Sequence, residues 1–463
     1  MRRWLLLIVV AVSVSSFAQN TSVVVNDISQ LNPIEVAAVV TPTTTEEVVN
    51  AVKRASIISI GGSRHSMGGQ IATEQSVHID MRKFNKVLAF SAATKQVTVQ
   101  AGITWRQLLE YIDKHDLSVS IMQSYADFTV GGSLSVNVHG RYIGQGPLIL
   151  SVLSVQVVLA NGEVVTASPS TNADLFYGII GGYGGLGVIT ECTLQLTDNS
   201  KVERQDEVMP IRDYHKWFMK QIRNNTNVVF HNANIYPPKY DKVRAISFVQ
   251  TKKPVTEKER LRPLDKSYAA NRAGFKLAKG KAGKWLREHV IDPVTYKTNP
   301  VYWRNYEASH DARELEPKSR LKSTYVLQEY FVPVDSFSSF YPQLASILKK
   351  HDVNMINISI RHAKKDPGSL LAWARTEVYA FVLYYTQGTT AKDKEKVGVW
   401  TRELINAALR CKGTYYLPYQ LHATEAQFER AYPNAHSFFL LKKRMDPTNK
   451  FRNKMWDKYY KEG

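Results

Sequence analysis

Three glycine-rich segments constrain this chain more than any other feature of its sequence. Each adjoins a stretch with the apolar pattern of a strand, and they span residues 60–70, 129–133 and 181–187. Glycine permits tight turns and lets backbone N–H groups approach anionic oxygens closely. One such loop can simply mark a turn, but three with polar residues between them predict an extended ligand held by backbone contacts at several places. The GxGxxG spacing of a Rossmann turn is absent from the 60–70 segment, so this loop alone does not indicate an NAD site.

Apolar periodicity predicts alternating strands and helices up to about residue 198. We expect helices at 43–54 and 104–114, strands at 36–40, 57–60, 77–80 and 96–100, and a hairpin of 152–159 with 163–166. Beyond residue 200, aromatic strands alternate with longer polar stretches, at 227–235, 245–250, 324–332, 354–362 and 376–386. With 463 residues, of which 44% are hydrophobic, the chain is long and apolar enough for two or three domains.

The first residues have the pattern of a processing segment. Arg2 and Arg3 precede an apolar run, and Ser16-Phe17-Ala18 resembles a cleavage site. We therefore predict that residues 1–18 are a signal peptide cleaved before Gln19, and that the protein is exported, to a bacterial periplasm or a membrane-associated position. The alternative is an N-terminal membrane anchor, for which the apolar run is short. The paired arginines also permit export by the twin-arginine route.

The net charge of +19 permits a nucleic acid, an anionic membrane surface or an anionic substrate as partner. Zinc-finger spacing, an aromatic RNA-binding signature and a basic zipper are all absent, so we expect no nucleic acid. Residues 252–288 are rich in Lys and Arg, with Phe275, Leu277, Trp285 and Leu286 between them. This stretch is interpreted either as a solvated pair of surface helices or as a patch that rests on anionic lipid.

The chain has only two cysteines, Cys192 and Cys411. They permit one disulfide in an oxidising compartment, but the sequence does not place them together. Cys192 falls in an alternating pattern that favours a buried strand position. Cys and His do not cluster at metal-ligand spacing, so we predict no metal site.

The order of these elements resembles the FAD-binding domain of the vanillyl-alcohol-oxidase type, also called the PCMH fold, over about residues 30–200. The resemblance depends on Thr41-Pro42, the 61–70 loop, Ile79-Asp80, Gln100-Ala101-Gly102, Thr129-Val130-Gly131-Gly132, His139-Gly140, Asp174-Leu175 and the segment 185–190. It implies an α+β fold: a two-subdomain FAD-binding domain at 30–200, an α+β substrate or cap domain with an antiparallel sheet at 201–420, and a C-terminal segment, 421–463, that returns to the FAD domain.

The same resemblance implies which residues contact FAD. The Gly61 loop would hold the pyrophosphate, and His65, between Arg64 and Ser66, would carry a covalent link to the flavin; a non-covalent contact is the alternative. Tyr125, Ala126 and Asp127 occupy the stretch where some relatives have a second linking cysteine, so one covalent bond is the limit. The implied FAD contacts are Gly61, Gly62, Ser63, Arg64, His65, Ser66, Gln70, Gly102, Thr129, Gly131, Gly132, Ser133, His139, Gly187, Val188, Ile189 and Asn453.

The second half resembles alditol and aldonolactone oxidases and decaprenylphosphoryl-ribose oxidase, on four segments: 139–141, 327–333, 357–361 and 416–419. This implies that Gln328 and Tyr330 face the substrate and that Asn357, Ser359 and Arg361 lie over the flavin. Tyr419 occupies the position of the relatives' lysine, Ser359 that of a cysteine and Tyr330 that of a second glutamine. These departures indicate either a different substrate or an alignment shifted by one residue.

The implied reaction is oxidation of a CH–OH group on a sugar, polyol or aldonolactone-like molecule, with hydride transfer to flavin N5. The candidate bases are His139, His362 and Tyr419, and the candidate cations are Arg141, Arg361 and Lys364. Strand alternation places Arg361 and His362 on opposite faces. Two alternatives stay open. One is the oxidase half of a two-enzyme epimerisation of a lipid-linked sugar, and the other is a non-catalytic flavin-binding protein.

Overall fold

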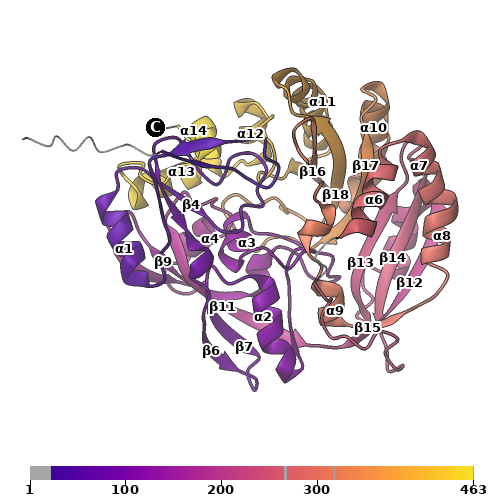
Figure 1. Cartoon of the computed structure of the whole chain (residues 1–463), viewed down its shortest axis with the longest axis horizontal. Coiled ribbons are helices and arrows are strands. Elements are labelled where there is room, and N and C mark those ends of the chain that lie inside the picture. Colours follow the sequence, from indigo (N-terminus) through magenta and orange to yellow (C-terminus); the bar gives the residue numbers. More distant parts are fainter. Residues whose placement is uncertain (1–21, 265–267, 318, 462–463) are drawn as a thin grey trace, which may run out of the picture.

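The computed structural model describes residues 22–264, 268–317 and 319–461, so the predicted signal peptide lies outside the described residues. Figure 1 shows two parts side by side. One combines the N-terminal segments with the C-terminal helices, and the other is built from the middle of the chain.

A small parallel sheet, in the order β3-β5-β4, begins the first part. Its strands are Ala38–Val40, Val77–Asp80 and Ile58–Gly61. Helix α1 (Thr45–Arg54) starts at an N-cap where the Thr44 side chain accepts from Glu47 N–H, and it buries Val48 and Val52. These valines share a core cluster with Ile58 and Ile79. Before this unit, β1 (Val23–Val25) pairs with β2 (Ile34–Val36).

A six-stranded sheet follows, in the order β10-β9-β11-β7-β6, with β8 paired to β11. Its strands are β6 (Val87–Ser91), β7 (Gln96–Gln100), β8 (Leu117–Val119), β9 (Val152–Val158), β10 (Val164–Ala167) and β11 (Val188–Asp198). The predicted hairpin is confirmed, since β9 and β10 pair in antiparallel register. The helices in this stretch are α2 (Trp105–Ile112), α3 (Val130–Val136) and α4 (Ala173–Ile179).

An eight-stranded antiparallel sheet dominates the second part, in the order β15-β12-β14-β13-β17-β18-β16-β19. The strands are β12 (Lys201–Pro210), β13 (Val228–Ile235), β14 (Lys242–Gln250), β15 (Val301–Trp303), β16 (Ser323–Pro333), β17 (Met355–Ala363), β18 (Val378–Gly388) and β19 (Thr414–Tyr415). With this sheet, the α+β class predicted from sequence is confirmed.

Helices cover one face of the large sheet and leave the other face toward the first part. The covering helices are α5 (Ile211–Gln221), α10 (Phe337–Lys350) and α11 (Ala391–Arg410). Phe337 and Phe340 of α10 pack on Phe381 of β18. Side chains of β16 alternate between these helices and the opposite face, and this alternation decides which β16 residues enter the site.

The remaining helices fall into two groups in chain order. Between β14 and β16 are α6 (Ala269–Ala278), α7 (Lys281–Leu286), a wider turn over Arg287–Ile291, α8 (Asp292–Thr295) and α9 (Arg304–Ala308). After β19 are α12 (Glu425–Ala431), α13 (Ala435–Met445) and α14 (Lys454–Tyr459). Residues just before α14 join the small parallel sheet, where Phe451 forms a parallel bridge with Ile58.

The two cysteines do not pair, so the disulfide permitted by the sequence is not formed. Both thiols are free and buried, with Cys192 in β11 as its alternating pattern predicts. Burial moves the pKa of the Cys192 thiol above its usual value, so this side chain is a neutral core residue. Among the described residues, none of the helices combines the length and apolar character needed to cross a bilayer.

Candidate active site

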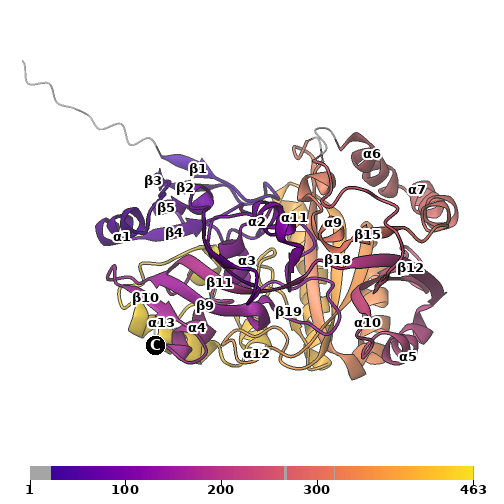
Figure 2. The same ribbon diagram turned by 90° about the horizontal axis from the view of Figure 1, so that it is seen from below.

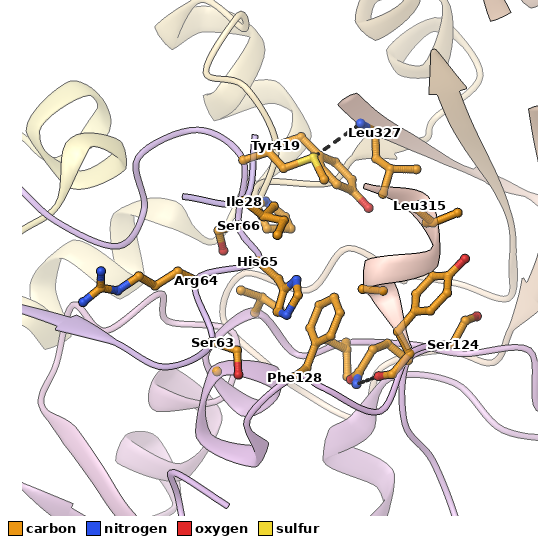
Figure 3. Close-up of a pocket in the computed structure, with 18 of the residues that line it drawn as sticks. Ile28, Ser63, Arg64, His65, Ser66, Ser124, Phe128, Leu315, Leu327 and Tyr419 are labelled. Atoms are coloured by element: carbon orange, nitrogen blue, oxygen red, sulfur yellow. Dashed lines mark hydrogen bonds between the residues drawn. The ribbon is translucent and has the colours of Figure 1, made fainter. Parts of the chain in front are cut away.

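A cavity of about 580 Å³ lies where the glycine loops meet the open face of the large sheet. Figure 3 shows part of its wall, with His65 and Phe128 side by side and Arg64 directed away from them. Most of the residues predicted from sequence line this cavity. They are Gly61, Gly62, Ser63, Arg64, His65, Ser66, Gln70, Thr129, Gly131, Gly132, His139, Gly187, Ile189 and Asn453, with Asn357, Ser359, Arg361 and Tyr419 on the substrate side.

The first glycine loop leaves β4 at Gly61 and exposes its backbone to the cavity. Within the described chain, none of the backbone N–H groups of residues 62–66 donates a hydrogen bond to a protein acceptor. Arg64 adopts the left-handed conformation with φ 60°, and its guanidinium turns away to pair with Asp80 at 3.2 Å. A row of unpaired half-buried donors is costly unless a ligand or water satisfies it. This loop is therefore suited to hold an anionic group.

The second glycine element supports the first through close packing. A Cβ added at Gly62 would lie 2.0 Å from Thr129 Oγ1, so no larger residue fits between the two loops without a shift. Ser63 Oγ donates to the carbonyl of Asp127 at 2.8 Å. Together these contacts set the position of His65 between the loops.

The imidazole of His65 is held on two sides. Its ring stacks on Phe128 with centroids 3.8 Å apart and planes 8° from parallel. Its Nε2 lies 3.0 Å from Asp127 Oδ2. When Nε2–H donates to this carboxylate, Nδ1 is the ring nitrogen that keeps a free lone pair. His65 thus presents an oriented, potentially nucleophilic imidazole in the cavity wall.

A chain of three polar side chains, His139, Glu329 and Tyr419, also lines the cavity. The Nε2 of His139 is 2.6 Å from Glu329 Oε2, and the hydroxyl of Tyr419 donates to Glu329 Oε1 at 2.7 Å. The side chains of His139 and Glu329 are 2% and 5% exposed. The His139 ring is packed against Trp373, 4.8 Å between centroids. These contacts place a fully partnered carboxylate inside the protein at the edge of the cavity.

Comparison with known proteins identifies the class of molecule. A family model described as an FAD binding domain matches residues 36–168. L-gulonolactone oxidase from Mus musculus is 26% identical over 87% of this chain and 89% of that protein. The putative D-arabinono-1,4-lactone oxidase of Neurospora crassa is 33% identical over 30% of this chain and 25% of its own length. Cytokinin dehydrogenase 1 from Arabidopsis thaliana is 32% identical, over 30% of this chain and 25% of that protein.

The chain is an FAD-linked oxidoreductase with a PCMH-type FAD-binding domain. It is homologous to L-gulonolactone oxidase, arabinono-lactone oxidase and cytokinin dehydrogenases, so the resemblance inferred from sequence is confirmed. The cavity fits this cofactor, because the unpaired N–H groups of residues 62–66 suit a diphosphate. His65 and Asn453, which also line the cavity, would contact other parts of the FAD. A covalent bond to His65 stays a prediction.

Charges on the substrate side of this oxidoreductase are strongly coupled. Burial raises the pKa of the Glu329 carboxyl, but His139, Arg361 and the Tyr419 hydroxyl outweigh it and hold that pKa below its usual value. Burial, reinforced by Glu329, moves the pKa of Tyr419 well above the ordinary tyrosine value. Glu329 is therefore an anion at neutral pH, with a neutral phenol hydrogen-bonded to it.

Arg361 contributes a half-buried cation to the cavity wall. Burial lowers the pKa of its guanidinium, and Glu329 partly opposes that effect. Its Nε is buried and has no hydrogen-bond partner within the described residues. A buried, unsatisfied donor beside a cofactor cavity indicates a group that is completed by a bound ligand.

The predicted roles of Gln328 and Tyr330 are wrong. Gln328 Nε2 donates to Thr401 Oγ1 of α11 at 2.7 Å, and the Tyr330 hydroxyl donates to Gln328 Oε1 at 2.6 Å. Both residues therefore face the covering helices, because side chains two apart in a strand share one face. The residue between them, Glu329, faces the cavity and was missed. Of these three neighbouring residues, only Glu329 lines the cavity.

Three of the predicted FAD contacts are structural residues that do not line the cavity. Gly102 lies against the backbone of Met81, where an added Cβ would come within 1.7 Å of the carbonyl oxygen. Ser133 accepts a hydrogen bond from the indole of Trp105 at 2.8 Å. Val188 is buried in the core under α1. All three residues pack inside the fold and are absent from the cavity wall.

The other candidate bases and cations are also displaced from the cavity. Arg141 pairs with Glu307 at 2.9 Å. His362 Nε2 lies 2.7 Å from Glu377, and its ring packs against Phe218 beneath α5, on the face opposite Arg361. Lys364 is exposed beyond the end of β17. Of the six predicted bases and cations, the cavity thus brings together His139, Arg361 and Tyr419.

Asp127 is a further functional residue that the sequence did not reveal. In the sequence it marks only the stretch where some relatives have a linking cysteine, whereas in the structure its carboxylate lies beside His65 Nε2 and orients the ring. A carboxylate close before the second glycine element is the signal that could have identified it, since a nucleophilic histidine is usually oriented by a partner.

Proposed function

We propose that this FAD-linked oxidoreductase oxidises a CH–OH group of a sugar, polyol or aldonolactone-like alcohol. The observation that supports this proposal is the buried pair of Glu329 and His139, joined by Tyr419 at the cavity wall. Bound FAD would supply the two-electron acceptor. Oxidation of an alcohol also requires a site that accepts the hydroxyl proton, and these three residues provide one.

The roles of the three residues follow from their exposure and charge. Tyr419 is the most accessible of them, so its hydroxyl oxygen would meet the substrate hydroxyl. We infer that the substrate proton passes to Tyr419 while the phenol proton moves to Glu329 Oε1. His139 keeps the carboxylate in place through Oε2. Arg361 adds positive charge on the same wall, where negative charge develops during the reaction.

The function is tested by a panel of aldonolactones, alditols and free sugars, scored anaerobically by bleaching of the flavin absorbance. At least one class should reduce the flavin, and L-gulono- and D-arabinono-lactones are the first compounds to try because of the homologues. If no alcohol in the panel reduces the flavin, the alternative of a non-catalytic flavin-binding protein gains support. A buried ionised carboxylate with a phenol beside it favours catalysis over that alternative.

We also propose that FAD is attached covalently through His65, because the ring is oriented in the cavity and its Nδ1 is free of the Asp127 contact. The wild-type polypeptide should stay fluorescent in a denaturing gel after acid treatment. The variant His65→Ala should release all of its flavin. Complete release of flavin from the wild-type protein would rule out the link.

Export is the third part of the proposal. It depends on residues 1–18 and on cleavage before Gln19, a segment outside the described residues. N-terminal sequencing of protein from a periplasmic fraction should begin at Gln19. Protein found only in the cytoplasm with Met1 intact would contradict it.

A further inference from the structure

Exposed apolar side chains are concentrated on helices α6 to α8. Among the described residues, the stretch from 264 to 294 has more exposed large apolar side chains than any other of similar length. Trp285 is 59% exposed and Val294 71% exposed. The others are Leu264, Leu277, Val290 and Ile291. A concentration of exposed apolar side chains in one stretch of this kind favours an interaction surface.

The same surface is basic. Between residues 268 and 297 the sequence has Arg272, Lys276, Lys279, Lys281, Lys284, Arg287 and Lys297 against two acids, Glu288 and Asp292. Both acids are engaged, since Glu288 accepts from Lys242 and Asp292 accepts from Tyr236. Lys276, Lys281 and Lys297 are exposed. Short basic helices with protruding Trp and Val residues are complementary to anionic lipid headgroups over an acyl layer.

These helices also line the outer end of the active-site cavity. Phe275, Leu277 and Ala278 of α6, Gly283 of α7, and the turn residues Arg287 and Ile291 form part of its wall. Leu277 and Ile291 are 43% and 40% exposed, so each lies on both the surface and the cavity wall. Figures 1 and 2 show α6 and α7 at the end of the molecule remote from α1 and α13. The apolar surface therefore borders the cavity.

The part of the cavity beneath these helices is apolar. Its wall includes Phe275, Leu315, Tyr325, Leu327, Ile356 and Tyr384, which form a separate small cluster. Arg287 connects the helices to β17, where it donates to the Ile356 carbonyl and to Asn357 Oδ1, each at 2.9 Å. Ser359 and Arg361 follow on the same strand face. An apolar chamber therefore leads to the polar catalytic wall.

We propose that helices α6 to α8 rest on an anionic lipid surface and admit an amphiphilic alcohol from it, with the apolar tail in the outer chamber and the CH–OH group at Tyr419. The substrate part of this inference rests on the proposed function. Membrane docking does not rest on the proposed function, because it depends only on the composition of the protein surface. A small free sugar would leave the apolar chamber unfilled.

Docking is tested by co-sedimentation of the full flavoprotein with vesicles of phosphatidylglycerol and phosphatidylcholine, and with vesicles of phosphatidylcholine alone. The wild type should bind the anionic vesicles at least tenfold more tightly, with loss of binding at high salt. The double variant Trp285→Ser/Val294→Asp should lose at least tenfold of that affinity. Leu440→Asp on α13, a residue 58% exposed at the other end of the molecule, is the matched control and should bind like the wild type.

Several outcomes would overturn docking. They are equal binding to both kinds of vesicle, equal loss in the control variant, or a dimer in solution that the double variant converts to monomer. The melting temperature of each variant should match the wild type, because the substituted side chains are exposed.

The substrate part has its own test. Two glycosides with the same sugar headgroup, one with a methyl and one with an octyl chain, should differ at least tenfold in KM for flavin reduction, with the octyl compound favoured. Equal KM values would overturn tail binding. Failure of every alcohol to reduce the flavin would instead overturn the proposed function and leave the docking result standing.

Discussion

The Nε2 of His139 and a carboxylate oxygen of Glu329 lie 2.6 Å apart, although 190 residues separate the two in the chain. His139 follows α3 in the FAD-binding domain, and Glu329 is on β16 of the large sheet. A buried carboxylate is costly unless it is paired, so this contact ties the two parts together at the point where the cofactor cavity meets the substrate wall.

The first prediction concerns the charge of Glu329. The variant Glu329→Gln keeps the shape but removes the proton acceptor, so kcat should fall by about 10²- to 10⁴-fold, the usual contribution of a positioned base. Flavin content should be unchanged. The measurement is anaerobic flavin reduction with the best alcohol of the panel.

Tyr330→Phe is the matched control for this variant. It removes a hydrogen bond on the other face of the same strand, which costs about 1 kcal/mol of stability and leaves kcat within about twofold. If Tyr330→Phe were slowed as much as Glu329→Gln, the assignment of the two faces of β16 would be wrong.

The second prediction concerns Asp127. Asp127→Asn keeps the side-chain volume but removes the carboxylate that orients His65. The fraction of chains with covalently bound flavin should fall, while non-covalent FAD binding persists. In-gel flavin fluorescence divided by total flavin absorbance measures this fraction. A fraction equal to the wild type would show that Asp127 is dispensable for attachment.

The third prediction concerns Arg361, whose Nε has no partner in the described residues. Arg361→Gln should lower kcat/KM by about 10- to 100-fold, as loss of a buried charge-assisted contact costs a few kcal/mol. Arg361→Lys should recover part of the loss because the charge is restored without the planar geometry. Steady-state kinetics decides this, and an unchanged kcat/KM in Arg361→Gln would exclude a role in the reaction.

The fourth prediction concerns acid stability. His231 is completely buried, and burial, with His362 nearby, lowers its pKa to about 3. Above the unfolded pKa of about 6.5 neither state binds a proton, so stability is unaffected. Below it the unfolded chain binds a proton that the folded state does not, and stability falls by about 1.4 kcal/mol per pH unit until pH approaches 3.

His231→Gln isolates this effect. It should be less stable than the wild type at pH 7, because the ring contacts to Tyr214 and Ser247 are altered. Between pH 6.5 and 4.5 its free energy of unfolding should fall by about 2 kcal/mol less than that of the wild type. Denaturant titrations at both pH values measure the difference. The same pH dependence in both proteins would mean that His231 is protonated in the folded state.

Short-range pattern was sufficient for much of the fold. The capped helix α1, the β9–β10 hairpin and the order of the glycine segments depend on residues close in sequence, where turn chemistry and periodicity act directly. The His65 loop could be located for the same reason. The PCMH-type domain followed from the order of such local elements.

The substrate wall was harder to predict because β16 is covered on both faces. Nearly every residue from Thr324 to Val332 is buried, so the apolar and polar residues do not alternate. A strand of this kind has no period-two signal that says which face meets the ligand. The resemblance therefore indicated Gln328 and Tyr330, whereas Glu329 is the residue of this strand segment that lines the cavity.

By itself, therefore, the sequence determined the class of fold, the cofactor loops and the position of His65, since each depends on the pattern of residues that are contiguous in the chain. Only the tertiary structure decided that Asp127 orients His65 and that His139 and Tyr419 converge on Glu329. It also decided that the basic apolar helices α6 to α8 line the cavity. The physical reason is that these are contacts between distant segments, selected by strand facing and by the need to pair buried charge, and neither is encoded in a local pattern.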